Sequence, residues 1–279
     1  MKRLFFPTIS LISLFAICTA AAAQQPAATT TALTTSEIEQ FLLKAKMGAR
    51  KSISTGINDT GWVPMDDGKM QHRGHIATVD ISKSSFTTDR GTEINFKDTY
   101  KFNIAAYELA KLLDFPLVPP SVERKVAGTP AAVTWWIDDA MMEGDRIKKK
   151  LQAPDLERWN NQMYAVRVFN QLIYNVDANL GNLLITKDWN LWMIDHSRAF
   201  RLYKTLENPK NLVKCDRRVL AKMRQLTKPM LTAKLGKWLS GIEIDGILGR
   251  RDKIVEFFDK EVAAKGEAAV LFDLAQRWF

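Results

Sequence analysis

The sequence has little cysteine and little histidine, and this scarcity excludes several kinds of site. Two cysteines among 279 residues cannot form a disulfide framework or a cysteine-rich zinc module. The three histidines, His72, His75 and His196, lack the paired spacing of a zinc protease helix. Long apolar runs are missing after the first 23 residues, and no solenoid repeat is visible. The remaining composition, 46% hydrophobic and 25% charged, is that of a globular protein.

The first 23 residues have the pattern of a secretory signal peptide. Two basic residues precede an apolar run over 4–18, and small residues at 20–23 form a cleavage pattern. We therefore expect cleavage after Ala23 and a secreted or periplasmic protein without a transmembrane helix. An uncleaved membrane anchor is the alternative, which the short apolar run disfavours. The mature chain would keep only Cys215 and no internal disulfide.

Basic residues outnumber acidic ones by 40 to 31, and the excess lies near the C-terminus. Residues 24–200 are balanced, whereas residues 201–279 carry 17 basic and 10 acidic residues. One interpretation is contact with an anionic surface such as a membrane, and the other is an ordinary solvated helix face. The chain has no recognisable nucleic-acid-binding motif, so we expect no nucleic acid as a partner.

The secondary-structure pattern changes near the middle of the chain. After a flexible leader over 24–35, we expect a strand-rich N-terminal lobe over 36–137 with one internal helix. A polar connector over 138–144 would be the hinge to a mainly helical C-terminal lobe over 145–279. Because strands and helices segregate along the chain, the expected fold class is α+β in two lobes.

Short signals place individual elements within these lobes. Apolar residues at helical spacing predict helices over 36–46, 100–113 and 156–174, the first behind a cap at Thr35 or Ser36. The Asp67-Gly68 pair predicts a hairpin. Further strands are expected at 93–97, 121–126 and 131–137, and Pro209 and Pro229 are expected to break the helical C-terminal part.

Three polar residues converge in the segment that follows the long helix. Apolar runs over 183–186 and 191–194 predict a hairpin with a four-residue turn, which places Asn182 and Asp195 opposite each other at its open end. Asp177 lies five residues before Asn182, on the loop that leaves the helix. Such hard oxygen ligands suit Mg²⁺ or Mn²⁺ bridging nucleotide phosphates. An ordinary hairpin with polar ends is the alternative.

This spacing, Asp-x4-Asn followed by an aspartate thirteen residues later, is that of a protein-kinase-like catalytic centre. In the first half of the chain, Lys97 ends an apolar strand shortly before the internal helix, where it could neutralise phosphate charge. Most lysines near strand ends are merely solvated, which is the competing interpretation. The best candidate for a phosphate-binding loop runs from Gly56 to Gly61, a common turn pattern.

Five segments of the chain form one larger pattern. They are 96–98, 103–109, 113–124, Asp177-x4-Asn182 and 194–196. Together they resemble a bacterial branch of atypical kinases related to the phosphatidylinositol 3-/4-kinase-like and HipA-like kinase folds. The resemblance covers roughly residues 50–202 and is most specific over 174–200.

The resemblance implies a two-lobed protein-kinase-like fold that uses ATP with Mg²⁺ or Mn²⁺. It implies that Lys97 contacts the ATP phosphates and that Asp177 is the catalytic acid/base residue. Asn182 and Asp195 would hold the metal. The connector after Trp135-Trp136 would be the hinge that receives adenine, with Trp136 and Asp138 as its cofactor-binding residues.

The leading hypothesis is therefore an exported kinase that transfers the γ-phosphoryl group of ATP to a hydroxyl of an unknown acceptor. The alternative is a pseudokinase that acts as a nucleotide-binding or scaffold module. It is favoured by Asn103, which occupies the position where many such kinases have a helix glutamate that pairs with the strand lysine. Glu108 lies about 140° further round the helix, which makes it a poor substitute.

Overall fold

The computed structural model describes residues 33–52, 60–88 and 91–275, which belong to one compact unit over Leu33–Phe279. The predicted signal peptide, most of the predicted leader and Gly56 lie outside the described residues. Among the described helices, none combines the length and the apolar character that crossing a membrane requires.

The first helix, α1 (Thr35–Lys44), begins one residue earlier than the sequence pattern predicts. Its cap is Thr34, whose hydroxyl accepts a hydrogen bond from the Glu37 N–H at 3.2 Å. The Glu37 carboxylate in turn accepts one from the Thr34 N–H at 2.8 Å. This reciprocal capping box requires a glutamate at the third helical position, which a cap at Thr35 would lack. A cap at Ser36 would have Glu39 there, but the Glu39 carboxylate accepts hydrogen bonds from Tyr107 and Lys111 instead.

The N-terminal lobe is built on an antiparallel sheet with strand order β1-β3-β4-β8-β7, and β2 pairs with β3. The strands are β1 (Lys46–Met47), β2 (Lys51–Ser52), β3 (Thr60–Asp66), β4 (Gln71–Ala77), β7 (Ser121–Val126) and β8 (Thr129–Trp135). The predicted turn at Asp67-Gly68 is confirmed, because it joins β3 to β4 with Asp66 opposite Gln71. Gly68 supplies a positive φ of 85° in that turn.

One face of this sheet carries the core of the N-terminal lobe. Ile76 and Val133 are fully buried there against α1. The Phe41 ring of α1 meets the Trp135 ring edge to face, with 5.7 Å between ring centroids. Trp192 from the C-terminal lobe closes the same cluster, so the two lobes share apolar packing.

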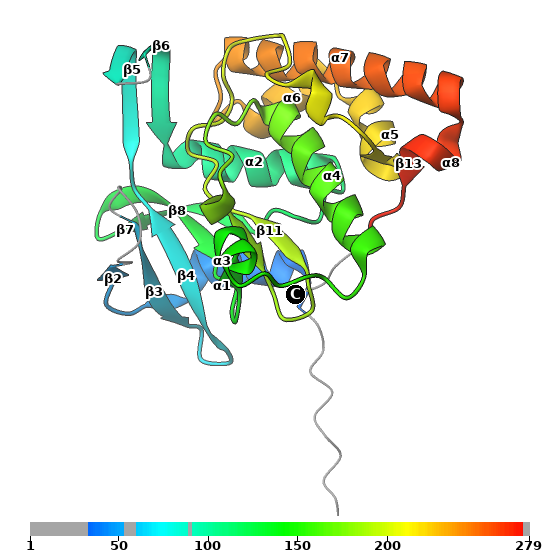
Figure 1. Cartoon of the computed structure of the whole chain (residues 1–279). Coiled ribbons are helices and arrows are strands. Elements are labelled where there is room, and N and C mark those ends of the chain that lie inside the picture. Colours follow the sequence, from blue (N-terminus) through cyan, green and yellow to red (C-terminus); the bar gives the residue numbers. More distant parts are fainter. Residues whose placement is uncertain (1–32, 53–59, 89–90, 276–279) are drawn as a thin grey trace, which may run out of the picture. The chain divides into compact units, whose positions relative to one another are not determined.

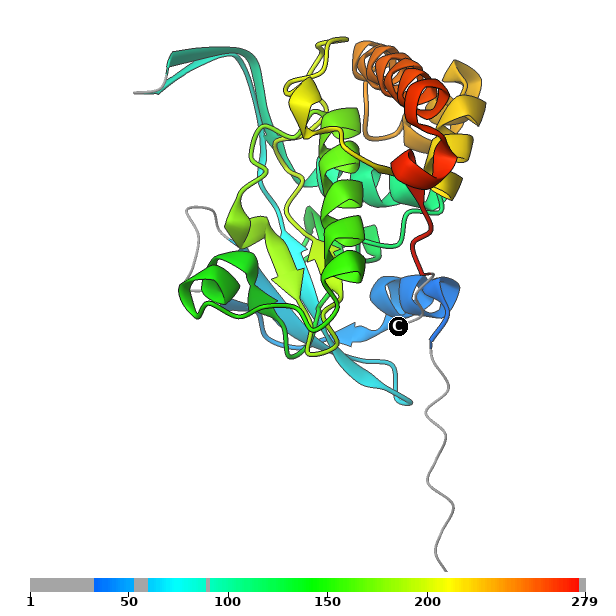
Figure 2. The ribbon, with the colours of Figure 1, turned by 45° about the vertical axis from the view of Figure 1, so that its right-hand side comes forward.

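A separate hairpin interrupts the lobe between β4 and the internal helix. Its strands, β5 (Asp80–Thr88) and β6 (Gly91–Thr99), pair with each other and form their own sheet. Both ribbon views show the hairpin extending from the end of β4 alongside the helical lobe (Figures 1 and 2). The sequence predicts strand character in this region, but it does not predict that the hairpin leaves the main sheet.

The internal helix and the following strands match the sequence pattern closely. The helix α2 (Tyr100–Leu112) begins behind Thr99, whose side chain caps it. The strand β7 has the predicted bounds, and β8 begins two residues earlier than predicted. In the connector, β9 (Met141–Met142) pairs with a strand of the C-terminal lobe, and α3 (Glu143–Lys148) begins before the predicted hinge ends.

The rest of the chain is mainly helical, as expected. It contains α4 (Leu156–Ile173), η1 (Leu180–Asn182), β10 (Leu183–Ile185), β11 (Leu191–Met193), η2 (Pro209–Asn211), β12 (Cys215–Asp216), α5 (Arg217–Gln225), α6 (Lys228–Leu235), α7 (Gly241–Lys265), α8 (Glu267–Val270) and β13 (Leu271–Phe272). Pro229 lies in the first turn of α6, where its missing N–H costs nothing, so the predicted break falls just before it, between α5 and α6. The predicted fold class is confirmed: the first half forms a strand-rich lobe and the second a helical lobe (Figure 1).

Candidate functional site

The loop after α4 is shaped by its own polar side chains. Tyr174 ends the helix in the left-handed conformation, with φ of 47°. The side chain of the buried Asn175 then accepts a hydrogen bond from the Asp177 N–H at 3.1 Å. Asn179 donates to the Asp177 carboxylate at 3.2 Å. These contacts fix Asp177 immediately beyond a buried helix end.

Asn182 is tied to the same loop. Its Nδ2 donates to the backbone carbonyl of Asp177 at 2.9 Å. A carbonyl can only accept, so the amide nitrogen must face Asp177. The carbonyl oxygen Oδ1 of Asn182 is then the atom that remains for a cation.

The predicted hairpin exists, with a register that differs by one residue from the prediction. β10 and β11 pair with Leu183 opposite Met193, and the Ile194 N–H donates to the Asn182 carbonyl at 3.0 Å. The expectation that Asn182 lies opposite Asp195 is therefore wrong, because Asn182 faces Ile194. The turn has three residues, not four, and ends on Trp189 in the left-handed conformation, with φ of 57°.

Asp195 follows immediately and also adopts a left-handed conformation, with φ of 52°. Its carboxylate accepts a hydrogen bond from the Ser197 N–H at 3.3 Å. Burial raises the pKa of this carboxyl above its ordinary value, and the nearby charges of Asp98 and Asp177 raise it further. The fold thus brings Asp177, Asn182 and Asp195 into one locality, where a cation would relieve the repulsion between carboxylates.

Asp98 is a member of this locality that the sequence interpretation missed. It is 7% exposed and sits near the end of β6. The next residue, Thr99, donates its N–H to the Ser197 carbonyl at 3.0 Å, so the end of β6 is bonded to the Asp195 segment. The sequence signal that could have drawn attention to Asp98 is strand alternation. Neighbouring residues of a strand point to opposite faces, so Asp98 points to the face opposite Lys97.

Lys97 forms an ion pair with a residue of the helical lobe. Its Nζ donates to the carboxylate of Glu243, on α7, at 2.5 Å. It also lines a cavity of about 280 Å³ with Phe102, Phe200 and Arg201. Neither the predicted catalytic residue Asp177 nor the predicted metal ligands Asn182 and Asp195 are part of that lining. The structure therefore brings Asp177, Asn182 and Asp195 together, whereas it joins Lys97 to a carboxylate that the sequence analysis did not consider.

Asn103, at the position of the expected helix glutamate, and Glu108, the poor substitute for it, both have other partners in the structure. The Asn103 side chain accepts a hydrogen bond from the His196 N–H at 2.7 Å, which supports the backbone next to Asp195. Glu108 forms an ion pair with Lys111 at 2.7 Å. Within the described residues, Glu243 of α7 forms the ion pair with Lys97 that neither Asn103 nor Glu108 of α2 forms.

The predicted hinge residues lie together beside the main sheet. The backbone carbonyl of Trp136 accepts a hydrogen bond from His72 Nε2 at 3.0 Å. The guanidinium of Arg73 lies 4.9 Å from the centroid of the Trp136 ring and also forms an ion pair with Asp138. This cluster is a cation–π and ion-pair arrangement on a strand end, and adenine contact by Trp136 and Asp138 stays a prediction.

Gly61 is part of the sheet and not of a described loop. It lies in β3, paired with Ser52 on one side and Ile76 on the other. A Cβ at this position would lie 2.7 Å from the Lys51 carbonyl oxygen, closer than real Cβ atoms come. The close approach of the neighbouring strand explains the glycine, whereas the rest of the predicted phosphate loop, with Gly56, lies outside the described residues.

The residues present fit a metal ion that takes most of its ligands from a nucleotide. Across the described part of the chain, no group of three or more His, Cys, Asp or Glu side chains is arranged to hold a metal by itself. Mg²⁺ typically needs only one or two protein carboxylates when substrate phosphates complete its shell. The partly buried Asp195 carboxylate and the oriented Oδ1 of Asn182 are donors of that kind.

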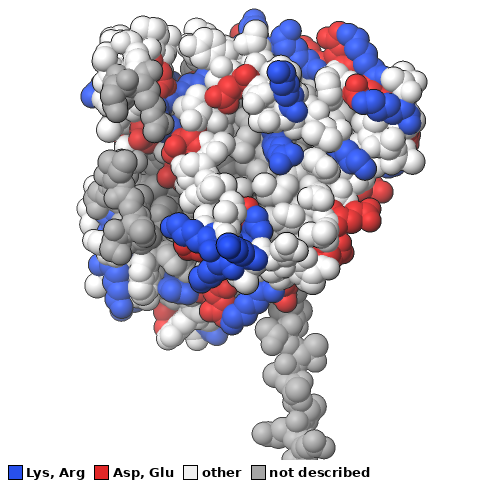
Figure 3. All heavy atoms as spheres, in the orientation of Figure 1, with Lys and Arg blue, Asp and Glu red and all other residues white. Residues whose placement is uncertain are grey.

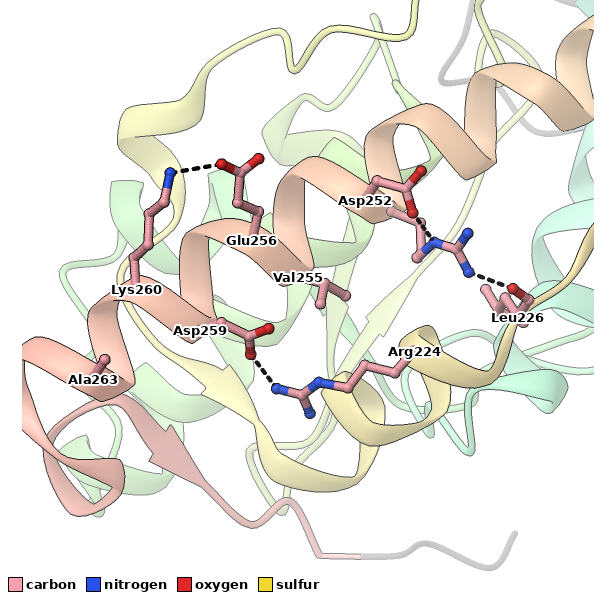
Figure 4. Close-up of a pocket in the computed structure, with 9 residues that line it drawn as sticks. Arg224, Leu226, Asp252, Val255, Glu256, Asp259, Lys260 and Ala263 are labelled. Carbon is pink, nitrogen blue, oxygen red and sulfur yellow. Dashed lines mark hydrogen bonds and ion pairs between the residues drawn. The ribbon is translucent and has the colours of Figure 1, made fainter.

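Another cavity, of about 720 Å³, lies on the helical lobe between the end of α5 and α7 (Figure 4). Its charged residues pair with one another, for example Arg224 with Asp259 and Lys260 with Glu256. The face seen in Figure 3 likewise shows basic and acidic side chains interspersed over the helical lobe. This pairing favours the interpretation of the basic residues as part of an ordinary solvated surface, and contact with an anionic surface stays a prediction.

Comparisons with known proteins identify the fold. No family model and no curated protein matches the sequence. Among solved structures, the Golgi casein kinase is similar with a TM-score of 0.60 and 12% identity, covering 86% of this chain and 78% of that one. The same kinase with Mn/ADP bound gives a TM-score of 0.58 and 13% identity, covering 85% of this chain and 78% of that one. A Helicobacter pylori proinflammatory kinase, CtkA, reaches a TM-score of 0.48 at 8% identity over 77% of this chain and 93% of that one. The likeness to the Golgi casein kinase shows that this chain has a kinase-like fold, with a strand-rich lobe and a helical lobe.

Proposed function

We propose that the chain is a metal-dependent kinase that transfers the γ-phosphoryl group of ATP to a hydroxyl acceptor. The observation that carries this proposal is the linkage of Asp177, Asn182 and Asp195 within one kinase-like fold. The solved kinase with Mn/ADP bound supports the choice of nucleotide and metal. The signal-peptide pattern of residues 1–23 supports action in a secreted or periplasmic compartment.

Each residue of the set has a separate task in this proposal. Asp177 orients the acceptor hydroxyl and accepts its proton as the bond to phosphorus forms. Asp195 and Oδ1 of Asn182 hold a divalent cation, which neutralises charge on the nucleotide phosphates when it is bound. The contact between Asn182 and the Asp177 backbone keeps the acceptor side and the metal side of the site in fixed relation. Lys97 keeps its predicted contact with the ATP phosphates, because its ammonium has three donors and the ion pair with Glu243 uses one of them.

The second candidate is a pseudokinase that binds nucleotide or a partner without turnover. Its support is the Lys97–Glu243 pair, in which the strand lysine engages a carboxylate other than the predicted metal ligands. Retention of all three polar residues argues for catalysis, because a scaffold has no physical need for two clustered, partly buried carboxylates.

The test is label transfer from γ-labelled ATP in Mg²⁺ and in Mn²⁺, with self-phosphorylation as the readout when no acceptor is supplied. Asp177→Asn should lower the rate by roughly 10²–10⁴-fold, the usual contribution of a general base. It should leave the ATP-induced thermal shift nearly unchanged, because Asp177 faces the acceptor in this proposal. A thermal shift without any label transfer in the wild type would favour the pseudokinase, and transfer that persists in the variant would remove Asp177 from its role.

A further inference from the structure

The β5–β6 hairpin is joined to the C-terminal lobe by ion pairs along one strand. Glu93, on β6, forms ion pairs with Arg198 at 2.5 Å and with Arg201. Four residues further along, Lys97 forms an ion pair with Glu243. The backbone carbonyl of Lys97 accepts a hydrogen bond from Arg201 at 3.3 Å. The strand is therefore held both to the segment that follows Asp195 and to the start of α7.

Glu243 is the most enclosed member of this network, with 1% of its side chain exposed. One carboxylate oxygen accepts hydrogen bonds from the Ser240 N–H at 2.6 Å and from its hydroxyl at 2.7 Å, which caps α7. The other oxygen receives the Lys97 ammonium. A buried carboxylate is costly unless it is paired, so this side chain strongly favours the arrangement in which β6 lies against α7.

The residues directly after Lys97 are those that meet the Asp195 segment. Asp98 lies close enough to Asp195 to raise the pKa of its carboxyl. Thr99 donates its N–H to the Ser197 carbonyl at 3.0 Å. A shift of Lys97 along or away from α7 would therefore move the two neighbours that border Asp195.

We propose that Glu243 is a positioning residue for Asp195, acting through Lys97 and the end of β6. This inference rests on the proposed function, because it assigns Asp195 to the metal. In this chain the ion pair to a strand lysine comes from a C-terminal-lobe helix, so the pair spans the two lobes. Orientation of the metal ligand then depends on contact between the hairpin and α7.

The experiment compares Glu243→Gln with the wild type and with Asp245→Asn as a matched control. Gln can still accept the Ser240 hydrogen bonds, so the variant keeps the cap of α7 and loses the charge that attracts Lys97. Asp245 lies on the same helix and pairs with Lys228 at 2.8 Å, away from the hairpin. Lys97→Met removes the same link from the strand side and covers the case in which Glu243→Gln fails to fold.

Two readouts are measured on the full chain: hydrogen exchange of the 97–103 and 195–201 segments without metal, and Mn²⁺ affinity by titration with ATP present. Glu243→Gln and Lys97→Met should each speed exchange in both segments and weaken Mn²⁺ binding by about 10-fold, at the low end for residues that orient metal ligands. Asp245→Asn should change neither. A purely structural role would lower the melting temperature and leave Mn²⁺ affinity at the wild-type value.

The proposal is overturned if exchange at 195–201 and Mn²⁺ affinity in Glu243→Gln match the wild type. It is also overturned if Asp245→Asn gives the same losses, since the effect would then follow from any charge change on α7. Absence of Mn²⁺ binding in the wild type with ATP present would refute the proposed function, and the exchange comparison would still decide whether Glu243 holds the segment around Asp195.

Discussion

The amide of Asn182 is oriented by the backbone of Asp177, through a hydrogen bond of 2.9 Å from Nδ2 to the carbonyl oxygen. The contact joins the residue proposed to handle the acceptor hydroxyl to a residue proposed to bind metal. Because the nitrogen is committed to this bond, the oxygen of the amide has a defined direction. Removal of the Asn182 side chain should therefore have two effects that can be measured separately: a less stable loop and weaker metal binding.

We predict that Asn182→Ala lowers the free energy of unfolding by about 1 kcal/mol, the net value of one hydrogen bond, and abolishes stabilisation by Mn²⁺ with ATP. Asn179→Ala is the control, because Asn179 also donates to Asp177, at 3.2 Å, and is not a proposed ligand. It should lose similar stability and keep the metal-dependent shift. Thermal denaturation with and without Mn²⁺ and ATP measures both the loss of stability and the metal-dependent shift. An unchanged metal shift in Asn182→Ala would exclude its side chain as a ligand.

Asp195→Asn should stabilise the protein when no metal is present. The folded-state pKa of Asp195 is raised by burial and by two neighbouring carboxylates, so the ionised form is disfavoured in the native state. Above that pKa the unfolded state holds the charge more easily, and stability falls as pH rises through it. We expect a melting temperature higher by about 2–4 °C in chelator at pH 7, which corresponds to roughly 1 kcal/mol in a domain of this size.

The gain from Asp195→Asn should shrink as pH is lowered, because the wild-type carboxyl then becomes protonated. Added Mn²⁺ with ATP should reverse the order and make the wild type the more stable protein. A variant that is less stable than the wild type in chelator at pH 7 would mean that the carboxylate has native partners strong enough to offset its burial.

Local signals in the sequence predicted the elements that depend on neighbouring residues. The helix α2, the strand β7 and the Asp67-Gly68 hairpin follow from periodicity and turn chemistry, which act over a few residues. The cluster of Asp177, Asn182 and Asp195 was predictable for the same reason, since one loop and one hairpin bring them together. The register error of one residue came from Trp189, because left-handed conformations are rare for tryptophan and no glycine marked the turn.

Contacts between segments that are distant in the sequence were not predictable from local sequence patterns. Lys97 and Glu243 are 146 residues apart, and nothing local to either residue specifies the other. The sequence marked Lys97 as a strand-end lysine, and strand alternation alone could have placed Asp98 on the face opposite to it. Which of the two faces meets Asp195 depends on how the hairpin leaves the main sheet, and that is decided by tertiary packing.

The in-sheet position of Gly61 gives a prediction about stability. Gly61→Ala should lower the free energy of unfolding by about 1–3 kcal/mol, the usual cost of overpacking, because its Cβ would lie 2.7 Å from the Lys51 carbonyl. Gly241→Ala is the control. No atom lies within 4 Å of its Cβ position, and it begins α7, so alanine there should be neutral or stabilising by up to about 1 kcal/mol. Urea denaturation compares them, and a neutral Gly61→Ala would contradict the tight strand packing.

The imidazole of His196 should make the fold sensitive to mild acid. The side chain is 2% exposed, its Nε2 has no hydrogen-bond partner among the described residues, and burial lowers its pKa from 6.5 to about 4. Between these two values the unfolded state binds a proton that the native state does not. Stability therefore rises with pH from 4 to 6.5 and is lost as pH falls through this range.

From pH 7 to pH 5 this single group should cost the wild type about 2 kcal/mol of unfolding free energy, given the two pKa values and the linkage relation. His196→Gln removes the titration, so its stability should depend less on pH by about that amount, even if its stability at pH 7 is lower. His75, whose pKa burial also lowers to about 4, is unchanged in the variant, so its contribution cancels in the comparison. Urea denaturation of both proteins at pH 5, 6 and 7 measures the difference. Parallel pH profiles would mean that the native state accommodates a charged imidazole beside Asp195, which its burial argues against.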